Sequence, residues 1–202
     1  MAKGLDVAVN STPQIGCLGE KGYAFIGRYY NTNRPSKNLT RAEAQALSAA
    51  GITIVVVWEN GFPTTAGYFS HAKGVADATA ALGLASGIGQ PAGSAIYFAV
   101  DYDALAADVS GPVTAYFQGV KSVFDAAPVQ YAAGVYGSGA TCQSLLNAGL
   151  VTFCWLSQST GFRGSKTFAA FNIKQGPEAT ICTMDADADE APDVATCGGF
   201  MV

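Results

Sequence analysis

The sequence predicts an α/β fold: a single irregular (β/α)8 TIM-like barrel with shortened helices near its C-terminus. Three observations lead to this prediction. Short β-branched or aromatic runs alternate with helical patterns along most of the chain, a rhythm typical of a parallel sheet. Eight such runs are present, which suits a closed barrel trimmed below the usual ~250 residues. Acidic residues recur where these runs end, on the face where barrels of this class carry their active sites.

The predicted strands are short and are bounded by turn residues or helical patterns. They cover residues 4–9, 23–30, 52–58, 95–100, 131–136, 153–157, 171–175 and 180–184. The helical patterns cover residues 11–21 (a short helix or turn), 40–50, 68–84, 113–126 and 139–148. The stretch before the last two strands is too short for full helices, so the barrel is expected to be irregular there. An open doubly wound sheet is the alternative architecture.

Local signals justify several of these boundaries. Thr40-Arg41-Ala42-Glu43 is a capping box that starts a helix, and Gly51 is the stop that follows it. Residues 86–93 are rich in glycine and include a proline, so they are expected to form a loop before the next strand. A nucleotide-binding loop would instead link a strand to a helix, so this segment is interpreted as a turn.

Composition limits the class of protein and its partners. The chain has 202 residues, of which 50% are hydrophobic and 13% charged, as expected for one ordered domain spanning 1–202. A net charge of -4 argues against nucleic acid or an anionic membrane as the main partner. No apolar run approaches the roughly 18–20 residues that span a bilayer. Met1-Ala2-Lys3-Gly4 leads straight into the first strand without a signal-peptide core.

The cysteines do not form a recognised metal pattern. Five are present, without CxxC spacing, which makes zinc unexpected and excludes a dense disulfide framework. One bridge, for instance between Cys182 and Cys197, and a set of buried free thiols are both open interpretations. The five positions are Cys17, Cys142, Cys154, Cys182 and Cys197.

The recurrent carboxylates are the main candidates for chemistry. They are Asp6, Glu59, Asp101, Asp103 and Asp185, each at or near the end of a predicted strand. Because parallel strands bring their C-terminal ends to one face, these side chains are expected to converge. Carboxylate clusters of this kind hydrolyse glycosidic bonds or bind metals, and glycoside hydrolysis generally uses two carboxyls. The spacing of Asp101 and Asp103 points both side chains the same way while the strand persists. The alternative is that Asp101 caps the following loop and Asp103 is solvated.

A second group of residues could line a glycan groove. Aromatic rings provide stacking platforms for sugar faces, and amides or Arg bind hydroxyls. This group consists of Arg28, Tyr29, Tyr136, Trp155, Gln158 and Gln175. Arg28 has a second interpretation, in which it neutralises a carboxylate of the cluster. Tyr97 and Phe98 are interpreted as core residues.

Other chemistries find little support. His71 is the only histidine, and no GxSxG motif is present, which argues against a Ser-His-Asp triad. The run from Asp185 to Glu190 resembles part of a calcium loop but lacks its glycine and its distal Glu. Asp187, Asp189 and Glu190 are therefore interpreted as a solvated turn after the last strand. No metal and no cofactor are expected.

Several segments together resemble a known family. They are Gly4-Leu5-Asp6, residues 22–29, Lys37-Asn38-Leu39-Thr40 with Glu43, residues 96–103, Gly134-Val135-Tyr136-Gly137 and Trp155-Leu156-Ser157-Gln158. In these segments the chain resembles a bacterial glycoside-hydrolase-like domain family, formerly a domain of unknown function. That family is similar to the muramidases of glycoside hydrolase family 25, and the resemblance covers nearly the whole chain.

The resemblance implies an irregular barrel that binds sugar and suggests roles for the carboxylates. The muramidase pattern has an Asp on strand one, an Asp-x-Glu at a middle strand end and an Asp near the last strand. This chain matches it with Asp6, with Asp101 and Asp103, and with Asp185. It departs from it at Asp103, which stands where the muramidases have their catalytic Glu. Glu59 could supply the longer carboxyl.

We therefore expect a glycoside hydrolase acting on bacterial cell-wall peptidoglycan or a related polysaccharide. Asp103 or Glu59 would be the general acid, and Asp101 the nucleophile or the stabiliser of the transition state. Asp6 and Asp185 would orient substrate and set pKa values. The alternative is a non-catalytic glycan-binding barrel that has lost its acid; an enzyme acting on a small phosphorylated sugar is a weaker third hypothesis. The protein is expected to be a monomer and to act outside the cytoplasm, exported by a route without a visible signal.

Overall fold

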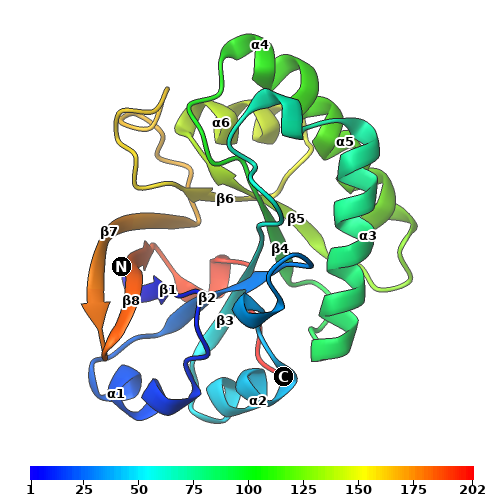
Figure 1. The fold of residues 1–202 in the computed structure, drawn as a ribbon. Coiled ribbons are helices and arrows are strands. Elements are labelled where there is room, and N and C mark those ends of the chain that lie inside the picture. The colour runs from blue at the N-terminus through cyan, green and yellow to red at the C-terminus, as the bar shows by residue number, and fades with distance from the viewer.

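The computed structural model describes residues 1–202 and contains a closed barrel of eight strands in chain order (Figure 1). The strands are β1 (Ala2–Asp6), β2 (Phe25–Tyr30), β3 (Thr53–Trp58), β4 (Ala95–Ala99), β5 (Ala132–Gly137), β6 (Phe153–Leu156), β7 (Ile173–Ile181) and β8 (Met184–Ala191). Strands β1 to β7 pair in parallel, whereas β8 runs antiparallel to both β7 and β1. The predicted barrel is confirmed, with one strand reversed.

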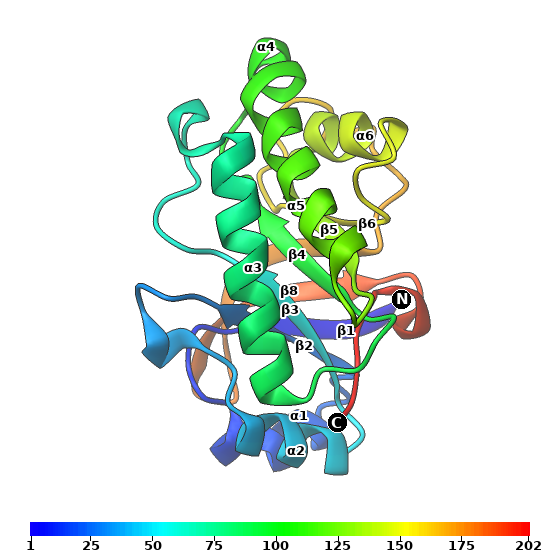
Figure 2. The same ribbon diagram turned by 90° about the vertical axis from the view of Figure 1, so that its right-hand side faces the viewer.

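The helices cover only part of the barrel. They are α1 (Ile15–Glu20), α2 (Arg41–Ala49), α3 (His71–Ile88), α4 (Ala106–Asp108), α5 (Thr114–Ala126) and α6 (Gly139–Asn147). Short 3-10 turns lie at η1 (Thr12–Gln14), η2 (Pro35–Lys37), η3 (Ala66–Tyr68) and η5 (Val194–Thr196), and a π turn at η4 (Val109–Val113). Helices α3 and α5 pack side by side on one flank (Figure 2). No helix follows β6 or β7, as the short connections predicted. None of the helices has the length and apolar character needed to cross a bilayer.

Two corrections concern element boundaries. Helix α3 continues to Ile88, so the first part of the predicted Gly/Pro loop is helical, and Gly89 ends the helix with a positive φ of 85°. The hydroxyl of Thr40 accepts from the Glu43 backbone N–H at 3.2 Å, as in a capping box. The Glu43 side chain, however, is directed into the core instead of back to Thr40.

The largest correction is at the C-terminus, where the predicted strand at 180–184 is the turn of a long hairpin. Cys182 and Thr183 form the turn with φ of 48° and 66°, the left-handed backbone that two-residue hairpin turns require. Cys and Thr are not typical of this turn, so the sequence did not predict it. Gly176 and Pro177, which follow the predicted strand at 171–175, lie at a register shift inside β7.

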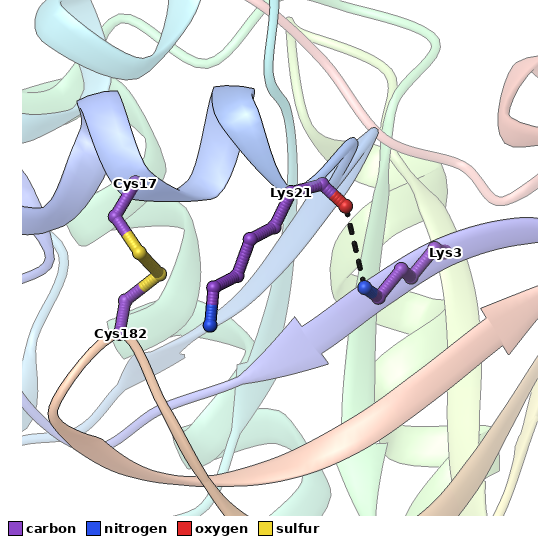
Figure 3. The surroundings of a disulfide bond; sticks show 4 residues. All are labelled: Lys3, Cys17, Lys21 and Cys182. Carbon is purple, nitrogen blue, oxygen red and sulfur yellow. Dashed lines mark hydrogen bonds between the residues drawn. A yellow bond between two sulfur atoms is a disulfide. The ribbon is translucent and has the colours of Figure 1, made fainter.

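A disulfide anchors this hairpin. Cys17 of α1 is bonded to Cys182 at the hairpin turn, with the two Cα atoms 5.9 Å apart (Figure 3). The suggested Cys182–Cys197 bridge is therefore wrong. Cys142, Cys154 and Cys197 are free and buried.

The apolar residues form two cores, one between the sheet and the helices and one inside the barrel. Phe25, Tyr97 and Trp155 fill the barrel interior. Gly27 makes room for them, because a Cβ there would lie 2.5 Å from the Trp155 ring. Tyr97 and Phe98 are fully buried, which confirms their interpretation as core residues. The filled interior closes the barrel below and leaves its C-terminal mouth as the place for a site.

Candidate active site

A cavity of about 230 Å³ opens at the C-terminal mouth of the parallel strands. Its lining combines four carboxylates with three aromatic rings. The lining residues are Asp6, Tyr29, Val57, Glu59, Ala99, Asp101, Tyr136, Trp155, Gln158, Ser159 and Asp187. Seven of them were expected in the site. Asp6, Glu59 and Asp101 were expected from the parallel-strand argument, and Tyr29, Tyr136, Trp155 and Gln158 as the lining of a glycan groove. The cavity therefore gathers residues from six parallel strands and the reversed β8.

Asp6, at the end of β1, is the centre of a hydrogen-bond network. The Tyr29 hydroxyl donates to Oδ1 of Asp6 at 2.9 Å, and Nε2 of Gln175 donates to Oδ2 at 2.9 Å. Only 3% of Asp6 is exposed. Burial raises the pKa of Asp6 to about 7; the Gln175 hydrogen bond opposes this shift and the nearby charge of Asp187 adds to it. Asp6 thus holds a proton more readily than an ordinary Asp.

Gln175, in β7, connects both sides of the mouth. Its Oε1 accepts from the Tyr136 hydroxyl at 2.8 Å, and its Nε2 lies 3.2 Å from Oδ2 of Asp187. The side chain of Gln158 donates to the other oxygen of Asp187 at 3.4 Å. The amide of Gln175 is therefore fully engaged with the protein, and it positions Asp6, Tyr136 and Asp187.

Glu59 and Asp101 differ from Asp6, because neither carboxyl accepts a hydrogen bond from the chain. Glu59 follows β3, and its side chain is 29% exposed. Burial raises the pKa of Glu59, while Lys37, whose Nζ lies 3.8 Å from Oε2, lowers it. Asp101 follows β4, and burial raises its pKa as well. Two carboxyls are thus free to contact a bound molecule.

The structure does not bring Asp103 into the cavity. Strand β4 ends at Ala99, so the alternation that would have aligned Asp101 with Asp103 no longer applies. Asp103 instead accepts from the backbone N–H of Arg163 at 2.7 Å and from its guanidinium at 2.6 Å. It fastens the loop after β6.

Arg28 also lies away from the mouth. It is fully buried, and its Nε donates to Oε1 of Glu43 at 2.9 Å. The backbone N–H and the hydroxyl of Ser11 both donate to the same Glu43 oxygen at 2.8 Å. Arg28 does neutralise a carboxylate, but that carboxylate belongs to α2 and not to the site.

The β7–β8 hairpin forms a second, larger cavity of about 640 Å³ beside the first. The two share Asp6, Tyr29 and Asp187 in their linings and therefore adjoin each other, and we refer to them together as the groove. Asp185 lies in the outer part of this groove as an exposed residue of β8, together with Glu178 and Thr180. The sequence predicted Asp185 at the end of a parallel strand, and this is wrong, because Asp185 lies near the start of the antiparallel strand β8.

Asp187 and Asp189 were interpreted as a solvated turn, and this is wrong. Asp187 pairs in register with Asp6, and Asp189 with Gly4. Asp189 is 5% exposed and accepts from Nε1 of Trp155 at 3.0 Å. Burial, followed by the charge of Asp6, raises the pKa of Asp189 well above its usual range. The strict alternation of Asp with Ala from Asp185 to Asp189 was the available signal, because it has the period of a strand.

The acidic mouth does not have the geometry of a metal site. No group of three or more His, Cys, Asp or Glu side chains is arranged to hold a metal ion. The arrangement offers two free carboxyls, further buried carboxyls behind them and an aromatic wall. This combination can protonate a leaving oxygen and stabilise positive charge.

Comparisons with known proteins identify the family and the fold of the chain. The model of the Rv2525c-like, glycoside hydrolase-like domain family matches residues 16–190. The uncharacterized protein YbfG of Bacillus subtilis is 35% identical over 161 residues. That match covers 73% of this chain but 22% of YbfG, so the chain spans less than a quarter of that relative.

Two solved structures show the same fold. One is the Tat-secreted protein Rv2525c of Mycobacterium tuberculosis in complex with L-tartrate, with a TM-score of 0.82, 20% identity and 98% of each chain covered. The other is the modular autolysin LytC of Streptococcus pneumoniae with a synthetic peptidoglycan ligand. It has a TM-score of 0.63 and 11% identity, with 93% of this chain and 46% of LytC covered. The expected relation to the lysozyme-like barrels is therefore confirmed at the level of the fold. Because the match at residues 16–190 covers most of the chain, this chain belongs to the Rv2525c-like, glycoside hydrolase-like domain family.

Proposed function

We propose that this barrel is a glycoside hydrolase that cleaves bacterial cell-wall peptidoglycan or a related polysaccharide by paired-carboxyl chemistry. One observation carries the proposal. Glu59 and Asp101 line the same cavity, and neither carboxyl accepts a hydrogen bond from the protein. Glycosidases need two such carboxyls on either side of the scissile bond.

Glu59 is the proposed general acid. Its raised pKa favours the protonated form that an acid must hold at the start of the reaction. The proton passes from Glu59 to the glycosidic oxygen as the bond from that oxygen to the sugar C1 breaks. Water then supplies the new hydroxyl at C1, and a proton returns to Glu59. Asp103, the other candidate acid, is engaged with Arg163.

Asp101 is the proposed nucleophile or charge stabiliser. A carboxylate beside C1 stabilises the oxocarbenium-like transition state, either as a neighbouring charge or by bonding to it. Asp6 and Asp187 lie in the same mouth, and the hydrogen bonds of Gln175 fix both side chains. Tyr29 and Tyr136 would form the walls against which sugar rings pack. The groove along the β7–β8 hairpin, with Asp185, would hold neighbouring sugars.

Two of the similar structures support a choice of substrate and of place of action. LytC is an autolysin solved with a peptidoglycan ligand, and Rv2525c is Tat-secreted. We therefore propose peptidoglycan as the first substrate to test, and action outside the cytoplasm. We also propose that residues 1–202 work as one domain without a partner chain.

A glycan-binding barrel without turnover is the second candidate. The observation that favours it is the ion pair of Asp103 with Arg163, because the matching position of the muramidases is their catalytic Glu. In this alternative, Glu59 and Asp101 bind sugar hydroxyls only.

Release of soluble saccharide from purified peptidoglycan, and from a panel of neutral polysaccharides, separates the two candidates. The variants are Glu59→Gln and Asp101→Asn, with Asp125→Asn on α5 as the control, since Asp125 is exposed and outside both cavities. We expect release by the wild type and by the control, and a loss of roughly 10²–10⁴-fold in each active-site variant. Absence of release by the wild type, with retained pull-down of one glycan, would show a binding barrel.

A further inference from the structure

A third cavity, of about 100 Å³, adjoins the mouth on the far side of Glu59. Its lining differs from that of the mouth because it contains two cations. The lining residues are Asn31, Asn33, Arg34, Lys37, Glu59, Gly61 and Phe62. No Lys or Arg lines the mouth cavity or the hairpin groove. Positive charge is thus confined to one side of the proposed acid, and Glu59 is the residue that the two cavities share.

Arg34 has no anionic partner in the protein. It takes part in no ion pair, and its guanidinium donates no hydrogen bond. The guanidinium carbon lies 5.7 Å from the ring centre of Phe62, which is 71% exposed. An exposed aromatic ring beside an unpaired guanidinium offers a face for a sugar ring and a fork of donors for an anion.

Lys37 provides a second cation, whose only ion pair is the long contact with Glu59. Its ammonium lies 3.8 Å from Glu59 and 5.0 Å from the ring centre of Tyr29, and it donates no hydrogen bond within the chain. Three N–H donors on this group therefore remain available to a ligand. Lys37 belongs both to the cationic cavity and to the surroundings of the proposed acid.

The loop that carries these cations is fixed by amide side chains. Asn60 Oδ1 accepts from the backbone N–H groups of Thr32 and Asn33 at 3.2 and 3.0 Å. Asn31 donates to the Glu59 carbonyl at 2.6 Å and accepts from the Arg34 backbone N–H. These bonds tie the backbone of the loop to the residue after β3 and so hold the part of the chain that carries Arg34 beside Glu59.

We propose that this cavity is a subsite for the carboxylate of an acidic saccharide unit next to the scissile bond, held by Arg34 and Lys37 with Phe62 against the sugar. The inference rests on the proposed function, since it assigns a substrate class to the same site. Muramic acid with a free lactyl group and a uronic acid both carry such a carboxylate. The acidic mouth repels an anion elsewhere, so charge alone selects the position of that unit along the groove.

Binding of the carboxylate would also act on the acid. Lys37 lowers the pKa of Glu59 in the free protein. A substrate carboxylate that draws Lys37 to itself, and places a negative charge nearby, raises that pKa again. The correct substrate thereby favours the protonated state from which Glu59 acts.

Equilibrium binding of matched saccharides tests the subsite. The Asp101→Asn background prevents turnover, and the ligands are muramic-acid-containing and glucuronate-containing oligosaccharides, each beside its carboxyl-reduced counterpart. In this background we expect the carboxylate form of one pair or both to bind three- to tenfold more tightly, the range for one or two exposed ion pairs. The added variants are Arg34→Gln and Lys37→Gln. Lys166→Gln is the matched control, because it removes the same charge from an exposed residue that lines none of the three cavities.

The outcomes are distinct. A preference that disappears in Arg34→Gln and in Lys37→Gln, and persists in Lys166→Gln, supports the subsite; the pair that shows it identifies the source of the carboxylate. Equal binding of both forms, or a preference unchanged by the Arg34 substitution, overturns it. Peptidoglycan release by the wild type is scored separately. Release without a carboxylate preference contradicts the subsite and supports the hydrolase. A carboxylate preference without release supports the subsite and contradicts the hydrolase.

Discussion

Gln175 and Asp6 lie 169 positions apart in the chain, yet the Gln175 amide donates to the Asp6 carboxylate at 2.9 Å in a buried contact. The reversed strand β8 separates β1 from β7 in the sheet, so this contact crosses the mouth over β8. It joins the first and the seventh strands and sets the position of the central carboxyl. A site of this kind exists only in the closed barrel.

The raised pKa of Asp6 predicts a stability that falls with pH. Asp6 binds its proton more tightly in the folded state, where its pKa is about 7, than an ordinary Asp side chain, whose pKa is 3.8. Between these values the folded state holds more protons than the unfolded state, so the free energy of unfolding decreases as pH rises. One such group contributes a slope of up to about 1.4 kcal/mol per pH unit.

Urea unfolding of the wild type and of Asp6→Asn between pH 4 and 7.5 measures this slope. The Asp6→Asn variant should lose the part of the pH dependence of unfolding that comes from Asp6. Asp185→Asn, at an exposed site on β8, should show the same pH dependence as the wild type. Equal slopes in all three proteins would contradict the assignment. Asp189 will maintain a residual slope of the same sign, since burial raises its pKa too.

Asp103 is predicted to be dispensable for turnover. Asp103→Asn removes an ion pair with Arg163 whose side chains are 34% and 47% exposed, so the loss of stability should be below about 1 kcal/mol. Saccharide release should remain within a few-fold of the wild type in the assay that defines the loss in Glu59→Gln. If Asp103→Asn were as inactive as Glu59→Gln, the assignment of Glu59 as the sole acid would be wrong.

Arg28 is predicted to be structural. Arg28→Met leaves the Glu43 carboxylate buried without its cation, which should lower the free energy of unfolding by about 3–5 kcal/mol. The double variant with Glu43→Gln should recover part of this loss, because a neutral amide still accepts from Ser11. Urea denaturation of the two variants provides the check. A glycan-binding role would instead appear as weaker saccharide binding at unchanged stability.

The Cys17–Cys182 bond is predicted to stabilise the hairpin that forms one side of the groove. Replacing both cysteines with serine should cost about 2–4 kcal/mol and lower the melting temperature. A reductant should lower the melting temperature of the wild type by a similar amount and leave the double variant unchanged. Cys142→Ser serves as a comparison for the loss of a buried free thiol. A reductant effect of equal size in the double variant would exclude this bond as its cause.

Much of this protein could be predicted from its sequence, because the signals involved are local. Apolar runs with helical patterns between them predict a barrel, and the position of Asp6, Glu59 and Asp101 after such runs predicts their convergence. Tyr136 and Trp155 were placed correctly for the same reason. These inferences need only the period of a strand and the rule that parallel strands end on one face.

The tertiary structure decided the rest. The reversal of β8 depends on two residues, Cys182 and Thr183, whose left-handed backbone is imposed by the hairpin and not by their own preference. That reversal brings Asp187 and Asp189 into the site. Arg28 and Asp103 were directed elsewhere by partners distant in sequence, Glu43 and Arg163. A sequence shows where a carboxylate or a guanidinium lies along the chain. Which group of opposite charge becomes its ion-pair partner is decided by how the elements pack.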